Sequence, residues 1–105
     1  MSLRLVFTDA AEQDLVGVFN YLAVAASVDV ASGYVARLTA LCEALAASPE
    51  RGMRRDDIRP GVRSYGWRRR ASIVFSVLNE EVLIIGIFVN GRDIESGLVD
   101  RDFGA

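Results

Sequence analysis

The run Arg59-Pro-Gly-Val-Arg-Ser-Tyr-Gly-Trp-Arg-Arg-Arg-Ala-Ser-Ile-Val-Phe75 opens the β-rich half of this 105-residue chain. It holds five of the twelve arginines and the only tryptophan. Residues 51–70 together carry eight arginines against two aspartates, whereas the whole chain has a net charge of −2. A basic segment on an acidic body sets up a local field that attracts an anionic partner. The alternative interpretation is a solvated, arginine-rich loop and strand edge.

Downstream of residue 61 the apolar pattern predicts three strands. The first is Val62 to Trp67, and the second is Ala71 to Val77, in which hydrophobic and polar residues alternate. Leu78 to Glu81 is a plausible hairpin turn. Val82 to Val89 is apolar at successive positions, which is typical of a strand that is buried on both faces. We therefore expect an antiparallel hairpin with this last strand in the interior of a sheet.

The first half of the chain predicts one strand and two helices. Leu3 to Phe7 alternates as a strand does, and Thr8 or Asp9 can cap a helix. Ser27 or Asp29 can cap a second helix, which Ser48-Pro49 should end. Apolar residues recur every three or four positions in both helices: Ala11, Leu15, Val18, Phe19, Leu22 and Ala25, then Ala31, Tyr34, Leu38, Leu41, Cys42 and Leu45. Residues 49–61, with both prolines, form a connecting loop.

These elements predict a single α+β domain over residues 1–105, in the order βααβββ. A helical hairpin should pack on one face of a small, mainly antiparallel sheet. Because the last strand is apolar on both faces, its side chains on the sheet face opposite the helices must also be shielded from water. We expect a protein partner to bind there. The alternative is that the C-terminal segment folds back over it, although the acidic tail beyond Gly97 is expected to be mobile.

The composition excludes several chemistries. The chain has no histidine and one cysteine, Cys42, so Ser/His/Asp and Cys/His nucleophiles and the usual zinc sites are excluded. All twelve cations are arginine, which binds phosphate or carboxylate and does not shuttle protons. We expect no cofactor, metal or disulfide. The longest apolar run has eight residues and no signal peptide is evident, so we expect a cytoplasmic protein that does not enter a membrane.

Arginines interleaved with Tyr65 and Trp67 on a strand suit two kinds of partner. Arginines can hold phosphates while the aromatic rings stack on bases. They can equally form a hot spot for an acidic protein segment. Composition alone leaves both possibilities open.

The chain resembles the RelE/ParE superfamily of toxins from type II toxin–antitoxin pairs. The residues that carry the resemblance lie, in order, at the acidic start of the first helix, at the end of the second helix, at Arg59-Pro-Gly-Val-Arg-Ser64, in the Ile73-Val-Phe75 strand, and in the closing stretch that ends in Arg92-Asp93. The Arg59–Ser64 segment and the final Arg-Asp are the most ParE-like. In the family's His-Gly-x-Arg-Asp pattern, this chain has Val89 and Asn90 in place of His and Gly.

The resemblance implies a toxin that inhibits DNA gyrase, contacts operator DNA only through its cognate antitoxin, and serves plasmid stabilisation. RelE-like relatives are ribosome-dependent mRNA endonucleases that use lysine, arginine and a late tyrosine. This chain has no lysine, and its late aromatic residue is Phe103, so the ParE-like alternative is favoured over the endonuclease. An inactive antitoxin-binding module is the third alternative. The residues expected to contact the target or the antitoxin are Arg59, Arg63, Tyr65, Trp67, Arg68, Arg69, Arg70 and Arg92.

Overall fold

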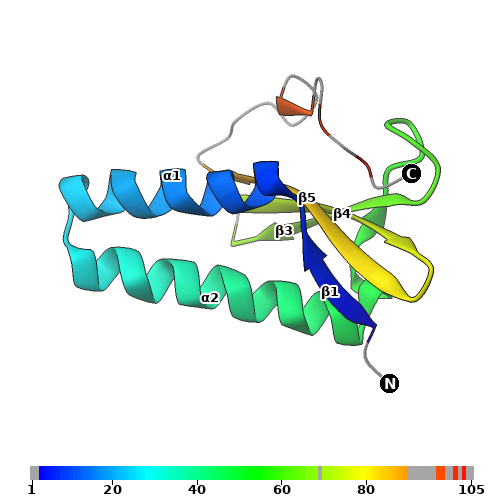
Figure 1. Ribbon diagram of the computed structural model, residues 1–105, viewed down its shortest axis with the longest axis horizontal. Helices are drawn as coiled ribbons and strands as arrows, with labels where there is room; N and C mark the ends of the chain where they lie inside the picture. The colour runs from blue at the N-terminus through cyan, green and yellow to red at the C-terminus, as the bar shows by residue number, and fades with distance from the viewer. Residues whose placement is uncertain (1–2, 69, 90–96, 99–100, 102, 104–105) are drawn as a thin grey trace.

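The computed structural model describes residues 3–68, 70–89, 97–98, 101 and 103. Its architecture has a helical hairpin lying across one face of a five-stranded sheet, as predicted (Figure 1). The elements in chain order are β1 (Arg4–Phe7), α1 (Asp9–Ala25), α2 (Val28–Ala47), a 3-10 turn η1 (Pro49–Arg51), β2 (Met53–Arg54), β3 (Val62–Trp67), β4 (Ala71–Leu78) and β5 (Glu81–Val89). The short η1 and β2 were not predicted, because neither is long enough to show a period.

Side-chain caps fix where both helices begin. Thr8 caps α1, and its Oγ1 accepts a hydrogen bond from the Ala11 N–H at 3.1 Å. Ser27 caps α2 in the same way, with the Val30 N–H as donor at 3.1 Å. Two alternative cap residues were predicted for each helix, and in both helices the earlier of the two forms the cap. α2 ends at Ala47, before Pro49, as predicted.

The strands lie in the order β1-β5-β4-β3-β2. β1 pairs with β5 in parallel, and the other neighbours are antiparallel. β5 is thus an interior strand, as its composition predicted. β4 and β5 are joined by Asn79 and Glu80, which both have positive φ, at 53° and 63°. A two-residue turn with φ above zero at both positions matches the twist of the flanking strands.

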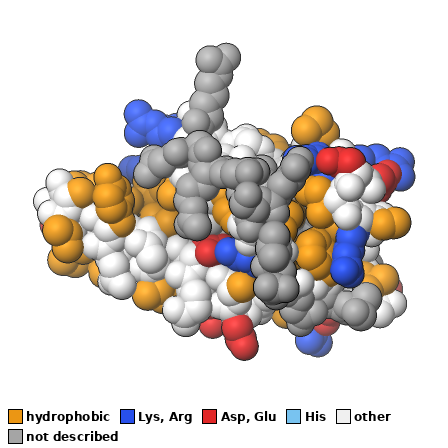
Figure 2. Space-filling view, turned by 90° about the horizontal axis from the view of Figure 1, so that it is seen from above, with side chains coloured by type: hydrophobic (Ala, Val, Ile, Leu, Met, Phe, Trp, Pro, Cys, Tyr) orange, Lys and Arg blue, Asp and Glu red, His pale blue; other side chains and the backbone are white. Residues whose placement is uncertain are grey.

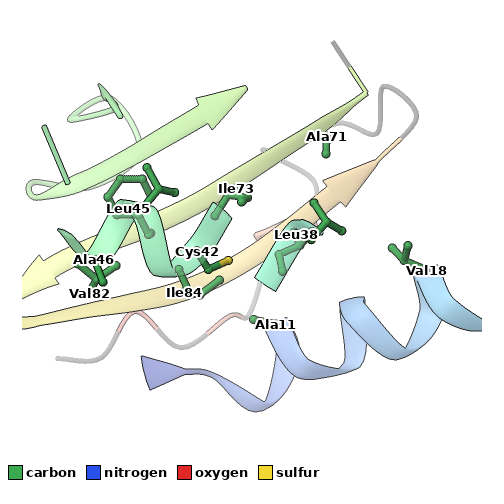
Figure 3. Packing of buried hydrophobic residues seen from close by; sticks show 12 residues of the cluster. Ala11, Val18, Leu38, Cys42, Leu45, Ala46, Ala71, Ile73, Val82 and Ile84 are labelled. Atoms are coloured by element: carbon green, nitrogen blue, oxygen red, sulfur yellow. The ribbon is translucent and has the colours of Figure 1, made fainter. Parts of the chain in front are cut away.

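The main core lies between the helices and the sheet (Figure 3). Leu38, Cys42 and Leu45 of α2 face Ile73 of β4 and Ile84 of β5, and none of these five has exposed surface. The predicted stripe of α2 is therefore core, and Cys42 is part of it. α2 also has the length and mean hydropathy of a membrane-spanning helix. In this fold, however, the apolar stripe of α2 is buried against the sheet.

A second, smaller core covers the other face of the sheet. It joins Val62, Val74, Ile85 and Phe88 to Leu98 of the C-terminal segment, and Leu98 is only 6% exposed. A register shift at Val74 and Phe75 in the β4–β5 pairing leaves Ile85 without a partner on β4. Such a bulge changes which side chains face each side of a strand.

This second core bears on two expectations from the sequence. Part of the far face of the sheet is covered by Leu98 and Phe103 of the C-terminal segment, which was the alternative to a protein partner there. The described residues beyond Gly97 are also packed, since Leu98 is buried and Phe103 lies against the same core. The leucine and phenylalanine of an otherwise acidic tail supply the apolar surface that the sheet requires.

Candidate functional site

The structure divides the predicted arginine cluster between the two ends of β3. Arg59 and Arg63 lie at its start, and Arg68 and Arg70 lie in the turn that follows it. At about 3.3 Å per strand residue, Arg63 and Arg68 are roughly 16 Å apart along the strand. The basic stretch therefore forms two separate groups.

The arginines at the start of β3 stabilise local structure. The Nη1 of Arg63 donates to the Gly52 carbonyl at 2.8 Å. The Arg59 guanidinium lies 4.6 Å from the centre of the Phe103 ring, a cation–π contact with the C-terminal segment. Arg55 forms a bidentate pair with Asp57, and this hydrogen bonding lowers the pKa of the Asp57 carboxyl. These contacts hold the β2–β3 loop in place.

Tyr65 and Trp67 face the helices. Both are partly buried against the main core, and the Trp67 ring meets Tyr34 of α2 edge to face, with centroids 5.5 Å apart. Their rings thus join β3 to the helical hairpin. They do not form an open platform of stacked aromatic rings on the outer face of the sheet.

The turn after β3 keeps two exposed arginines from the predicted set. Arg68 has a positive φ of 51°, and its guanidinium lies 5.3 Å from the centre of the Trp67 ring. Arg70 is exposed beside the start of β4. Arg69 and Arg92 lie outside the described residues. The turn that holds Arg68 and Arg70, here called the basic turn, presents two exposed guanidinium groups to a partner, and Arg59 is also exposed at the other end of β3.

The basic turn borders a groove that the sequence did not reveal. This groove, of about 540 Å³, runs between the helical hairpin and the ends of the sheet strands. Its lining comes from four parts of the chain: Gln13, Asp14, Gly17, Val18, Tyr21 and Leu22 of α1, Val30 and Tyr34 of α2, Arg70 of the basic turn, and Ile87 and Val89 of β5. No sequence pattern predicts it, because it depends on how far the hairpin projects past the sheet.

Apolar side chains continue from the groove onto the projecting end of the hairpin. This end extends beyond the strands (Figure 1), and hydrophobic side chains gather on it (Figure 2). Five large hydrophobic residues of α1 and α2 are at least half exposed: Val16, Tyr21, Val24, Val28 and Val30. All but Val16 lie in the last turns of α1 or the first turn of α2, where the two helices meet. Val24 is 89% exposed. An apolar surface of this kind marks a binding site for another protein.

Asp14 is the buried charge of the groove wall. Its side chain is 10% exposed and pairs with Arg101 of the C-terminal segment, with Oδ2 2.6 Å from Nη1. Oδ2 also accepts the Ile87 backbone N–H at 2.9 Å. β1 ends its pairing with β5 at Ile84, so Asp14 provides an acceptor beyond the end of that ladder.

The groove combines apolar and charged surface. Within the part of the chain that the structure describes, no three His, Cys, Asp or Glu side chains are grouped as metal ligands. The groove offers an apolar floor with a guanidinium at its rim. This combination suits an amphipathic segment that carries an acidic residue beside its apolar face.

A protein family and two solved structures are similar to this chain. Residues 5–94 match the family model described as the ParE toxin of the type II toxin–antitoxin system, parDE. The fold is similar to a chain in the structure of a chromosomal ParDE toxin–antitoxin system from P. aeruginosa, with 25% identity, a TM-score of 0.73, and coverage of 84% of this chain and 96% of that one.

A second similar structure is the RelBE2 toxin–antitoxin complex from Mycobacterium tuberculosis. Its matching chain is 16% identical, with a TM-score of 0.61 and coverage of 88% of this chain and 95% of that one. At this identity the likeness concerns the fold. No curated protein sequence matches the chain.

Proposed function

The chain belongs to the ParE toxin family of type II toxin–antitoxin systems, within the RelE/ParE superfamily, and we propose that it inhibits DNA gyrase and is neutralised by an antitoxin bound in the groove. The groove is the observation that carries the antitoxin part of this proposal. The site of action is then the cytoplasm, where gyrase works on DNA, and residues 1–105 act as one domain.

The groove has the form expected of a site for a partner helix. An α-helix is about 10–12 Å wide and presents apolar anchors at intervals of three and four residues. Val18, Leu22 and Ile87 supply an apolar floor for such anchors, and Arg70 can pair with a carboxylate on the partner. The similar chain from P. aeruginosa belongs to a ParDE toxin–antitoxin system, which supports an antitoxin as the occupant.

Gly17 allows a direct test of this site. It lines the groove, and a Cβ added there meets no atom within 4 Å. We expect Gly17→Trp to fill the groove and to abolish co-purification with the co-expressed antitoxin. Gly33→Trp is the matched control, because Gly33 also lies on a helix with open space but outside the groove lining. Equal co-purification of both variants would place the antitoxin elsewhere.

The proposed gyrase inhibition rests on the family and on the residue types that the chain contains. Cleavage of a phosphodiester bond requires groups that move protons, and arginine does not normally do so. The chain has neither histidine nor lysine, and its two groups of arginines are separated along β3. A protein-binding role for the basic turn requires no proton transfer.

The test is a supercoiling assay with purified gyrase, run beside a ribosome-dependent mRNA cleavage assay on the same protein preparation. We expect supercoiling to be lost and the mRNA to remain intact. Cleavage without loss of supercoiling would identify a RelE-like endonuclease. Neither activity, with antitoxin binding retained, would identify an inactive binding module.

A further inference from the structure

Asp14 is shared between the groove and the C-terminal segment. On the groove side it belongs to the lining, next to Val18 and Ile87. On the other side its two oxygens accept hydrogen bonds from Arg101, with Oδ2 to Nη1 at 2.6 Å and Oδ1 to Nη2 at 3.1 Å. A carboxylate that is 10% exposed depends on such donors, because water alone no longer stabilises its charge.

Arg101 fastens the C-terminal segment to the rest of the domain. Its Nε donates to the Gly97 carbonyl at 2.8 Å, and its Nη1 also donates to the Ile85 carbonyl at 3.0 Å. The guanidinium lies 5.1 Å from the centre of the Phe88 ring. One side chain thus connects α1, β5 and Gly97 of the C-terminal segment.

Filling the groove changes the cost of losing Arg101. In an open groove, water next to Asp14 can partly replace the guanidinium if Arg101 is withdrawn. An apolar occupant displaces that water, so the carboxylate would keep only the Ile87 N–H as a donor. Removing one partner of a buried ion pair is strongly destabilising because it leaves an uncompensated charge. The ion pair should therefore matter more when the groove is occupied.

We propose that Asp14 and Arg101 are positioning residues that couple the groove to the C-terminal segment. An occupant of the groove strengthens the hold of Arg101 on Asp14, and Arg101 in turn favours occupation of the groove, because energetic coupling between two sites is reciprocal. The natural occupant is the antitoxin only if the proposed function holds. The coupling itself applies to any apolar group that excludes water from Asp14.

The test supplies the occupant within the chain by means of Gly17→Trp. The equilibrium constant for unfolding is measured in urea with and without Arg101→Gln, in the wild-type, Gly17→Trp and Gly33→Trp backgrounds. We expect Arg101→Gln to raise this constant about 10-fold more in the Gly17→Trp background than in the other two. If the Arg101→Gln variant is unfolded, Arg101→Lys, which keeps the positive charge, takes its place. We expect the same background to show the largest effect on the unfolding constant, with a smaller difference between backgrounds.

The Asp14→Asn substitution distinguishes an effect of the Asp14 charge from an effect of side-chain packing around it. The asparagine keeps an oxygen for the Ile87 N–H but carries no charge, so the dependence of Arg101→Gln on groove filling should disappear. An equal cost of Arg101→Gln in all three backgrounds, or a dependence that persists with Asp14→Asn, overturns the coupling. The measurement uses neither gyrase nor antitoxin, so it fails or succeeds independently of the proposed function.

Discussion

Cys42 shows how the environment of one side chain sets its chemistry. The thiol has no exposed surface, and burial raises its pKa to about 12, with the negative charge of Glu43 acting in the same direction. Because the thiolate is the reactive form, a thiol that stays protonated is inert. The position of Cys42 in the apolar stripe of a helix was sufficient to predict that it belongs to the core.

We expect the native chain to leave Cys42 unmodified by a thiol reagent such as DTNB at pH 8. At that pH roughly one thiol in 10⁴ would be ionised, even before steric protection is considered. In urea the same chain should release one equivalent of chromophore, which is the control. Rapid reaction without urea would show that α2 separates readily from the sheet.

The raised pKa also has a consequence for stability. The unfolded thiol loses its proton near its ordinary pKa of 9.0, whereas the folded thiol keeps it to about 12. The contribution of the neutral thiol is therefore fully present below pH 9 and is lost as the pH rises toward 12.

Glu80 carries backbone strain in the β4–β5 turn. Its φ of 63° lies in the left-handed region, which costs a residue with a Cβ about 1 kcal/mol and costs glycine almost nothing. We expect Glu80→Gly to raise the free energy of unfolding by up to about 1 kcal/mol in urea denaturation. Asn79→Gly is the comparison, since asparagine tolerates this region and should gain less. A loss of stability in Glu80→Gly would refute the strain.

At the same scale, the sequence identified residue types better than their contacts. It singled out the arginines, but it could not show that Arg63 is engaged by the Gly52 carbonyl while Arg70 reaches a groove. In the sequence, Asp14 is one of several acids near the start of α1. Its role depends on Arg101, 87 positions later, and no local pattern records such a pairing.

At the scale of elements, the strong periodicities of the sequence were sufficient to predict the long helices and the main strands. The strands β3, β4 and β5 were predicted within one residue of their observed starts, and one of the two caps offered for each long helix is the observed one. Each of these elements has several turns or pairs of residues to show its period. The partner of β1 could not be predicted, since parallel pairing with β5 is decided by the helical crossover. The C-terminal cover of the second sheet face was only the alternative prediction, because the few apolar residues of that segment are scattered among acids.

The two helix caps make a matched pair for a test. Thr8 Oγ1 accepts from Ala11 N–H and also donates to the Ile84 carbonyl of β5 at 3.1 Å, whereas the exposed Ser27 caps α2 alone. We expect Thr8→Ala to lower the free energy of unfolding by about 1–2 kcal/mol and Ser27→Ala by about 0.5–1 kcal/mol. Urea denaturation of both variants measures the difference. Equal losses would mean that the bond from Thr8 to β5 adds nothing.

For the whole molecule, the division of the arginines matters more than the net charge of −2. The basic turn stands at the rim of the groove, because Arg70 lines it together with Tyr21 and Val30 of the helical hairpin. An antitoxin seated in the groove would therefore lie against Arg70 and restrict access to the basic turn. In this arrangement, one binding event occupies the groove and also covers the arginines proposed to meet the target.

This arrangement predicts how two sets of variants should differ. Arg68→Ala with Arg70→Ala should weaken gyrase inhibition and lower antitoxin affinity by about 3- to 10-fold, because exposed charge pairs contribute up to about 1 kcal/mol each. Gly17→Trp should lose antitoxin binding while inhibiting gyrase at wild-type concentrations, since it removes neither arginine of the basic turn. The charge-matched control is Arg51→Ala with Arg54→Ala, at the opposite end of β3, which should leave both activities within about 2-fold of wild type. Titrations of supercoiling and of antitoxin binding measure the two properties separately. If the control pair weakens gyrase inhibition as much as the basic-turn pair, inhibition depends on the overall positive charge of the region. The basic turn would then not be a specific contact site for gyrase.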